Sequence, residues 1–207
     1  MWAGGRLLPL SGCTATRELG HLMMYVNIAA RVTLALVFSV ALVSKLRSRS
    51  DYRAFRQSIM DMRLFPRNVA SPVAALTVAV EAGIVLLLTF PATVRLGFAL
   101  AALLLFAMTS AIAIAIGRGH RSSCRCFGRS MTPLGRIHVV RDVLLLCVAL
   151  LGGLSSLLQP VARSHPGGVA VAAGVGLVLT ILVAASDDLI AVFGNSPRRA
   201  HDTTRSW

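Results

Sequence analysis

Five apolar stretches, each long enough to cross a lipid bilayer, constrain the fold of this chain more than any other feature. A helix needs about 20 residues to span a hydrocarbon core of about 30 Å. With 56% hydrophobic and only 14% charged residues, the 207-residue chain lies outside the range of soluble domains. We therefore expect an all-α integral membrane protein, a four-helix transmembrane bundle plus a fifth, glycine-rich helix, with spans at residues 25–45, 70–90, 94–116, 137–158 and 167–185.

The domain organisation follows from where these stretches begin and end. Residues 1–24 form a polar amino-terminal extension, residues 25–194 a single transmembrane domain, and residues 195–207 a basic tail that we expect to be disordered. Small residues in the fifth stretch, such as Gly174 and Gly176, would allow close helix packing if this helix joins the bundle.

The formal charge of +13 reports orientation here, not nucleic-acid binding, because the basic residues lie between the spans. Fifteen of them fall on one side of the expected topology and four on the other. The positive-inside rule then places the amino terminus outside. The first and third connections and the carboxyl-terminal tail face the cytoplasm of a cell-membrane protein.

The first connection contains an amphipathic segment at about residues 50–65. Tyr52, Phe55, Ile59 and Met62 recur at helical spacing, while arginines take the other faces. This pattern predicts an interfacial helix, with Ser50 as its cap and its arginines near anionic lipid. A surface for a partner protein is the alternative.

The connection at residues 117–136 carries the residues best suited to chemistry, Cys124 and Cys126. Two cysteines this close can close only a strained disulfide, which is easily reduced. The neighbouring arginines favour thiolate over thiol. A purely structural loop is the competing interpretation. Cys147 lies well inside the fourth span, where a free cysteine is usually a small buried hydrophobic residue.

A metal site competes for the same connection. His120, Cys124 and Cys126, with His138 further on, offer two thiolates and two imidazoles. Their spacing fits no common zinc module, although soft Cu(I) accepts closely spaced thiolates. We therefore predict no resident metal and keep Cys124, Cys126 and His120 as the alternative ligand set.

Glu81 lies near the middle of the second span, where a charge costs several kcal/mol unless it is paired or protonated. Counting depth from the outer ends of the spans makes Arg31 a better partner than Lys45. A structural contact between helices and a proton carrier for thiol chemistry are both compatible with this position. Arg141 and Asp142 form a second charged pair at the entry of the fourth span.

The order of these features resembles the methylamine utilisation protein MauE family, within the DoxX-like four-helix membrane proteins. Its signals are Ser44-Lys45-Leu46, Val80-Glu81-Ala82-Gly83, the Cys124-Arg125-Cys126-Phe127-Gly128 element and Arg141-Asp142. The resemblance implies Cys124 and Cys126 as a redox pair, with Lys45, Glu81 and Arg141 as supporting polar positions. Arg125 and Asp142 depart from the family pattern, where a small residue and asparagine are usual.

The resemblance also implies a membrane accessory protein that acts through thiol-disulfide exchange. The expected role is maturation, processing or export of the small subunit of methylamine dehydrogenase, with a thioredoxin-like protein or a disulfide client as partner. Passing electrons across the membrane would require a bound quinone or movement of the loop into the bundle. A non-enzymatic assembly factor and a carrier of Cu(I) or a small solute are the alternatives.

Overall fold

Long apolar sequences fold here into helices, as hydrogen bonding inside lipid requires. The computed structural model describes residues 11–61, 66, 68–118, 136–158 and 165–193, and it describes side chains at residues 20–61, 66, 68–118, 139–158 and 165–185. Its elements are α1 (Ser11–Leu46), α2 (Arg49–Asp61), α3 (Ala70–Thr89), the short 3₁₀ helix η1 (Pro91–Thr93), α4 (Val94–Gly117), α5 (Arg136–Leu158) and α6 (Pro166–Phe193).

Five of these helices are long and apolar enough to span a membrane. The candidate spans cover residues 20–46, 70–89, 91–117, 139–158 and 166–185, which confirms the expected all-α multi-pass membrane protein. Much of their apolar surface faces outwards, as the exposed Leu103, Phe106 and Leu154 illustrate. Such side chains suit contact with hydrocarbon. Helix α1 starts before its span, at Ser11.

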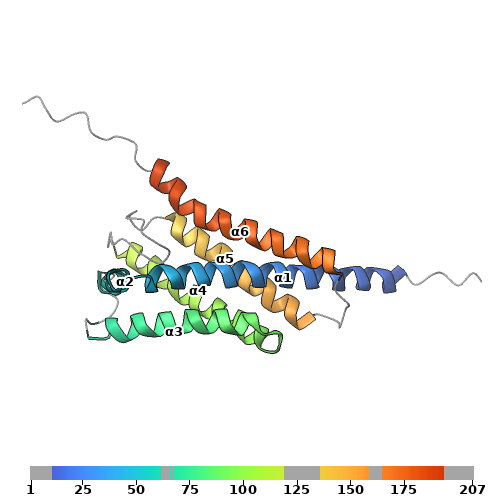
Figure 1. Ribbon diagram of the computed structural model, residues 1–207, viewed down its shortest axis with the longest axis horizontal. Coiled ribbons are helices and arrows are strands. Elements are labelled where there is room, and N and C mark those ends of the chain that lie inside the picture. Colours follow the sequence, from blue (N-terminus) through green and yellow to red (C-terminus); the bar gives the residue numbers. More distant parts are fainter. Residues whose placement is uncertain (1–10, 62–65, 67, 119–135, 159–164, 194–207) are drawn as a thin grey trace, which may run out of the picture.

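The spans form a four-helix bundle with one helix added outside it (Figure 1). Helix α1 packs against α3 and α5, and α4 packs against the same two helices from the far side. Helix α6 lies along α1 on the outside of this bundle. One end of the bundle, at which α1 and α4 finish and α3 and α5 begin, is called the Lys45 end below.

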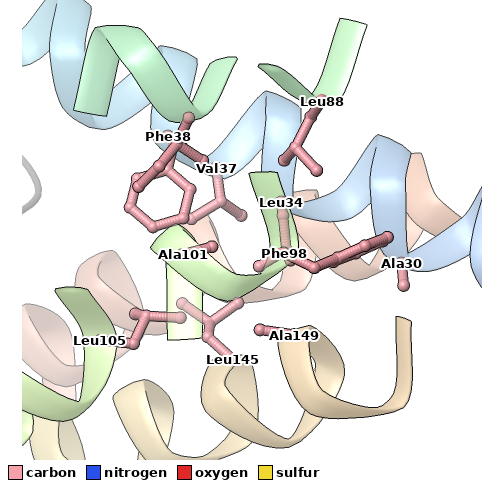
Figure 2. Close-up of a cluster of buried hydrophobic side chains, with 11 residues drawn as sticks. Ala30, Leu34, Val37, Phe38, Leu88, Phe98, Ala101, Leu105, Leu145 and Ala149 are labelled. Atoms are coloured by element: carbon pink, nitrogen blue, oxygen red, sulfur yellow. The ribbon is translucent and has the colours of Figure 1, made fainter. Parts of the chain in front are cut away.

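The core lies where α1, α3, α4 and α5 meet (Figure 2). Leu34, Leu88, Phe98 and Leu145 come from these four helices in turn and are almost completely buried. Because lipid is as apolar as these side chains, close packing rather than water exclusion holds the helices together. The fit of each pair of surfaces therefore decides stability.

Phe98 fits its place only because α5 has a glycine opposite it. A Cβ atom at Gly152 would collide with the Phe98 ring and would lie 2.9 Å from the Ala30 Cβ. The same position carries a polar tie, since the buried Asn27 side chain donates to the Gly152 carbonyl oxygen at 3.0 Å. Interhelical hydrogen bonds of this kind stabilise membrane bundles.

Helix α6 packs on α1 through small residues. A Cβ atom at Gly176 would lie 2.8 Å from the Ala29 carbonyl oxygen, so the two backbones are in close approach. The Thr33 hydroxyl lies 3.3 Å from the Gly176 carbonyl oxygen, and the Thr180 hydroxyl lies 3.5 Å from the Thr33 carbonyl oxygen. The fifth helix is thus peripheral to the bundle but specifically docked.

Helix α2 crosses the bundle axis at the Lys45 end and is seen nearly end-on in Figure 1. It contacts both α1 and α3, and Phe55 and Ile59 pack against Ala70 and Ala74. Its cap differs from our expectation. Ser48, not Ser50, precedes the first turn, and its hydroxyl accepts the Asp51 backbone N–H at 3.1 Å. The helix begins one residue before Ser50, which leaves Ser50 inside the first turn.

Substituting Gly152 with Ala tests the packing of Phe98. Collision with the ring should cost about 1–3 kcal/mol of stability, as overpacking usually does. Gly153→Ala is the matched control, since a Cβ there meets Phe98 at an ordinary 3.6 Å. Thermal unfolding in detergent should show a lower midpoint for Gly152→Ala only. Equal midpoints for both variants would contradict the packing described.

A second pair of substitutions tests the docking of α6. Gly176→Leu should push α6 away from α1 and lower the unfolding midpoint, because the new side chain meets backbone at Ala29. Gly174→Leu is its control, because a Cβ at Gly174 has nothing within 4 Å. A midpoint lowered equally in both variants would show that the docking surface lies elsewhere.

Candidate functional site

Lys45 and Glu81 form an ion pair inside the bundle. Lys45 lies in the last turn of α1 and Glu81 beyond the middle of α3, and the Lys45 ammonium donates to Glu81 Oε1. Both residues are buried, with 3% and 5% of their surfaces exposed. A charge pair shielded this well from solvent is a feature that apolar packing alone would not produce.

This pairing corrects the expectation that Arg31 is the partner of Glu81. Arg31 donates instead to the carbonyl oxygens of Leu88 and Thr89, at the last turn of α3. Those carbonyl groups belong to the helix end, where no further turn supplies a donor. Arg31 therefore caps the carboxyl-terminal end of α3, and its guanidinium group binds carbonyl oxygens there and not the Glu81 carboxylate.

The direction of side chains explains why depth counting chose the wrong partner. Side chains on a helix lean towards its amino terminus. Helices α1 and α3 run in opposite directions, so Lys45 leans away from the Lys45 end and Glu81 leans towards it. In Figure 1, α3 also starts beyond the point at which α1 finishes. The two side chains thus approach each other although their backbones lie at different depths.

Helix α2 supplies a third member of this site. The Lys45 Nζ atom lies 4.6 Å from the centre of the Phe55 ring, within the range of a cation–π contact. Sequence reasoning assigned Phe55 to the apolar face of the interfacial helix but did not connect it with Lys45. An aromatic residue on a helix that follows the lysine closely in the sequence was the available signal.

Only one of the two Glu81 carboxylate oxygens has a hydrogen-bond partner among the described residues. Its Oε1 atom accepts from Lys45, whereas its buried Oε2 atom has no hydrogen-bond partner among them. An unsatisfied buried oxygen costs about 1–3 kcal/mol. The site can therefore hold α1 to α3, and it keeps one acceptor for a proton or a hydrogen-bond donor.

Arg141 and Asp142 form a second buried pair near the start of α5. Arg141 Nη2 lies 3.3 Å from Asp142 Oδ1, and 6% and 3% of the two residues are exposed. Lys45 lies in the last turn of α1, and the side chain of Glu81 leans back towards it from beyond the middle of α3. Because α5 begins at the Lys45 end, Arg141 and Asp142 lie near that end as well. This agrees with their expected place at the entry of the span.

The cysteine pair cannot be placed by contacts. Cys124 and Cys126, with the alternative ligand His120, lie outside the described residues. Helix α4 ends at Gly117 and α5 starts at Arg136, and both of these helix ends lie at the Lys45 end. Within the part of the chain that is described, no three His, Cys, Asp or Glu residues are grouped to hold a metal.

Cys147 differs from our expectation of a buried residue. It is a free thiol on the outer surface of α5. The helix turns Leu145 and Ala149 inwards, and Cys147 lies between them on another face. Its burial was inferred from depth in the span, which does not show which face of the helix meets lipid.

Asn27 and Thr33 were missed by sequence reasoning as residues that hold the helices together. Asn27 ties α1 to α5, and Thr33 lies in the interface with α6. A polar residue within an apolar span was the signal available for both.

A double-mutant cycle tests the Lys45–Glu81 pair. Lys45→Met leaves a buried carboxylate without its cation and should cost about 3–5 kcal/mol, the usual cost of breaking a buried pair. Glu81→Gln should also destabilise, while the double variant should recover much of the loss. Unfolding in detergent measures all three, with the exposed Arg95→Gln as control. Additive single effects would contradict direct pairing.

Comparison with known proteins identifies the family of this chain. A family model described as "Methylamine utilisation protein MauE" matches residues 23–155, which contain most of each span from α1 to α5 and the residues of both charged pairs. The methylamine utilization protein MauE of Methylophilus methylotrophus is 32% identical over 119 residues, covering 56% of this chain and 61% of that protein. No solved structure matches significantly. The expected resemblance is confirmed, and the chain belongs to the methylamine utilisation protein MauE family.

Proposed function

We propose that this chain is a membrane accessory protein of methylamine utilisation that exchanges thiols and disulfides through Cys124 and Cys126. The client suggested by the family resemblance is the small subunit of methylamine dehydrogenase. The observation that carries the proposal is where the helices that flank the cysteines end. Helix α4 finishes and α5 begins at the Lys45 end, near Lys45 and the Arg141–Asp142 pair.

The proposed exchange balances without a cofactor. A thiolate of the pair attacks one sulfur of a client disulfide, forming a mixed disulfide and releasing a client thiolate. The second cysteine then attacks its partner, which closes the Cys124–Cys126 disulfide and releases the second client thiolate. Two electrons pass to the client. A thioredoxin-like dithiol returns the pair to its reduced state, and the reverse sequence oxidises a client.

The arginines of the segment are assigned a role in activating the pair. Arg121, Arg125 and Arg129 lie within three residues of the two cysteines in the sequence. Positive potential stabilises the thiolate, which is the attacking species. The strain of a ring closed by two cysteines one residue apart makes its disulfide a ready oxidant. Both properties favour exchange over permanent cross-linking.

The charged pairs are assigned a positioning role. Lys45–Glu81 joins α1 to α3, and Arg141–Asp142 lies in the helix that follows the cysteine segment. The first pair holds α1 against α3 at the end of the bundle where α4 finishes and α5 begins. These side chains transfer no electrons in the proposed exchange.

An exchange partner on the same side removes the need for electrons to cross the membrane. The charge distribution favours a cytoplasmic position for this side, because fifteen basic residues belong to it and four to the other. Cys147 lies on the outer surface of α5 within a span, so it does not form a second pair on the other side of the membrane. The partner dithiol therefore belongs to the compartment that the cysteine segment faces.

Replacing both cysteines with serine tests the proposal. The double variant Cys124→Ser/Cys126→Ser should lose maturation of the co-expressed small subunit, measured by its disulfide content on non-reducing gels. Cys147→Ser is the matched control and should keep it, because that thiol is not part of the pair. Full maturation with the double variant would contradict the redox role and favour a non-enzymatic assembly factor.

A further inference from the structure

Helix α2 has two distinct faces, and the basic one has no function in the site described above. Phe55 and Ile59 are buried against α3, with Tyr52 packed beside them. Arg49, Arg53 and Arg56 follow at spacings of four and three residues, which places them on one strip of the helix surface. This arginine strip borders the buried face.

The charges of the arginine strip are not balanced by nearby acids. The two carboxylates of α2 are engaged with neutral partners. Asp51 Oδ2 accepts from the Ser48 hydroxyl at 2.7 Å, and Asp61 Oδ1 accepts from the Gln57 amide at 2.9 Å. Among the residues with described side chains, none forms an ion pair with the arginine strip.

Arg56 carries an unused donor inside the protein surface. Its Nε atom is buried and has no hydrogen-bond partner among the described residues, while the rest of the side chain is partly accessible. A buried donor without an acceptor costs free energy. Guanidinium groups bind phosphate oxygens through paired N–H donors, and the accessible part of the Arg56 side chain can offer such donors to a phosphate.

The position of α2 determines which phosphate can reach it. The helix lies across the Lys45 end, beside the last turn of the α1 span and the first turn of the α3 span. This is the level at which a bilayer places its headgroups. Basic residues at this level are attracted to anionic lipids by about 1 kcal/mol each.

We propose that Arg49, Arg53 and Arg56 form a binding site for the phosphate of an anionic phospholipid headgroup. The proposal does not depend on the redox function. The bound phosphate holds α2 from its basic strip while Phe55 contacts Lys45 from the buried face. The lipid thereby clamps α2 over the Lys45–Glu81 pair, and the order of this end responds to the lipid composition of the leaflet.

Titration of the purified full-length protein with short-chain phosphatidylglycerol tests the site. Native mass spectrometry counts the bound lipid, and short-chain phosphatidylcholine serves as the neutral arm. The variant Arg53→Gln/Arg56→Gln should bind phosphatidylglycerol about 30-fold more weakly, about fivefold for each arginine. The control Arg95→Gln removes an exposed charge at the opposite end of the bundle and should leave the affinity unchanged.

A competition experiment with inorganic phosphate shows whether the site binds a lipid headgroup or a free phosphate ion. Inorganic phosphate should compete only weakly, because it lacks the acyl chains that hold a headgroup at this level. Arg49→Gln/Arg53→Gln, which alters only exposed side chains, gives a second test if Arg56→Gln impairs folding. Equal binding of phosphatidylglycerol and phosphatidylcholine, unchanged affinity in the arginine variants, or phosphate binding as tight as lipid binding would each overturn the proposal.

Discussion

A carboxylate in the middle of an apolar helix must be compensated, and the rest of this structure depends on how that is done. Glu81 meets Lys45, which comes from the end of a different span. The pair fixes the last turn of α1 against α3, and α2 packs against both helices at this end of the bundle. Phe55 completes the enclosure of the ammonium. One electrostatic requirement thus organises three helices.

The buried charged side chains of the bundle are concentrated towards the Lys45 end. Lys45, Arg141 and Asp142 lie near that end, and the side chain of Glu81 reaches Lys45 from beyond the middle of α3. The opposite half of α1 is joined to its neighbours by neutral contacts of Asn27 and Thr33 and by the capping of α3 by Arg31. Buried charges in a membrane are costly and are therefore associated with function. The two helices that flank the cysteines in the sequence finish and begin at the same end. The proposed chemistry and the proposed lipid site are both assigned to this end.

The spans could be predicted from the sequence because lipid selects for length and hydrophobicity, which are local properties. The polar positions Lys45 and Glu81 could be named as well, since charges stand out in apolar stretches. Their pairing could not, because it depends on which helices are neighbours and on the opposite lean of their side chains. The same limit applies to Cys147, since depth in a span does not reveal which face meets lipid. Composition likewise could not show that α6 docks on α1.

Trapping the mixed disulfide tests the central claim most directly. In Cys126→Ser or Cys124→Ser, the remaining thiol can attack a client but the resolving thiol is missing. Co-expression with the small subunit of methylamine dehydrogenase should then accumulate a covalent adduct in at least one single variant. The adduct should disappear on reduction and be absent from the double variant. If neither single variant forms a reductant-sensitive adduct while the wild-type protein still matures the client, the thiol-exchange account is wrong.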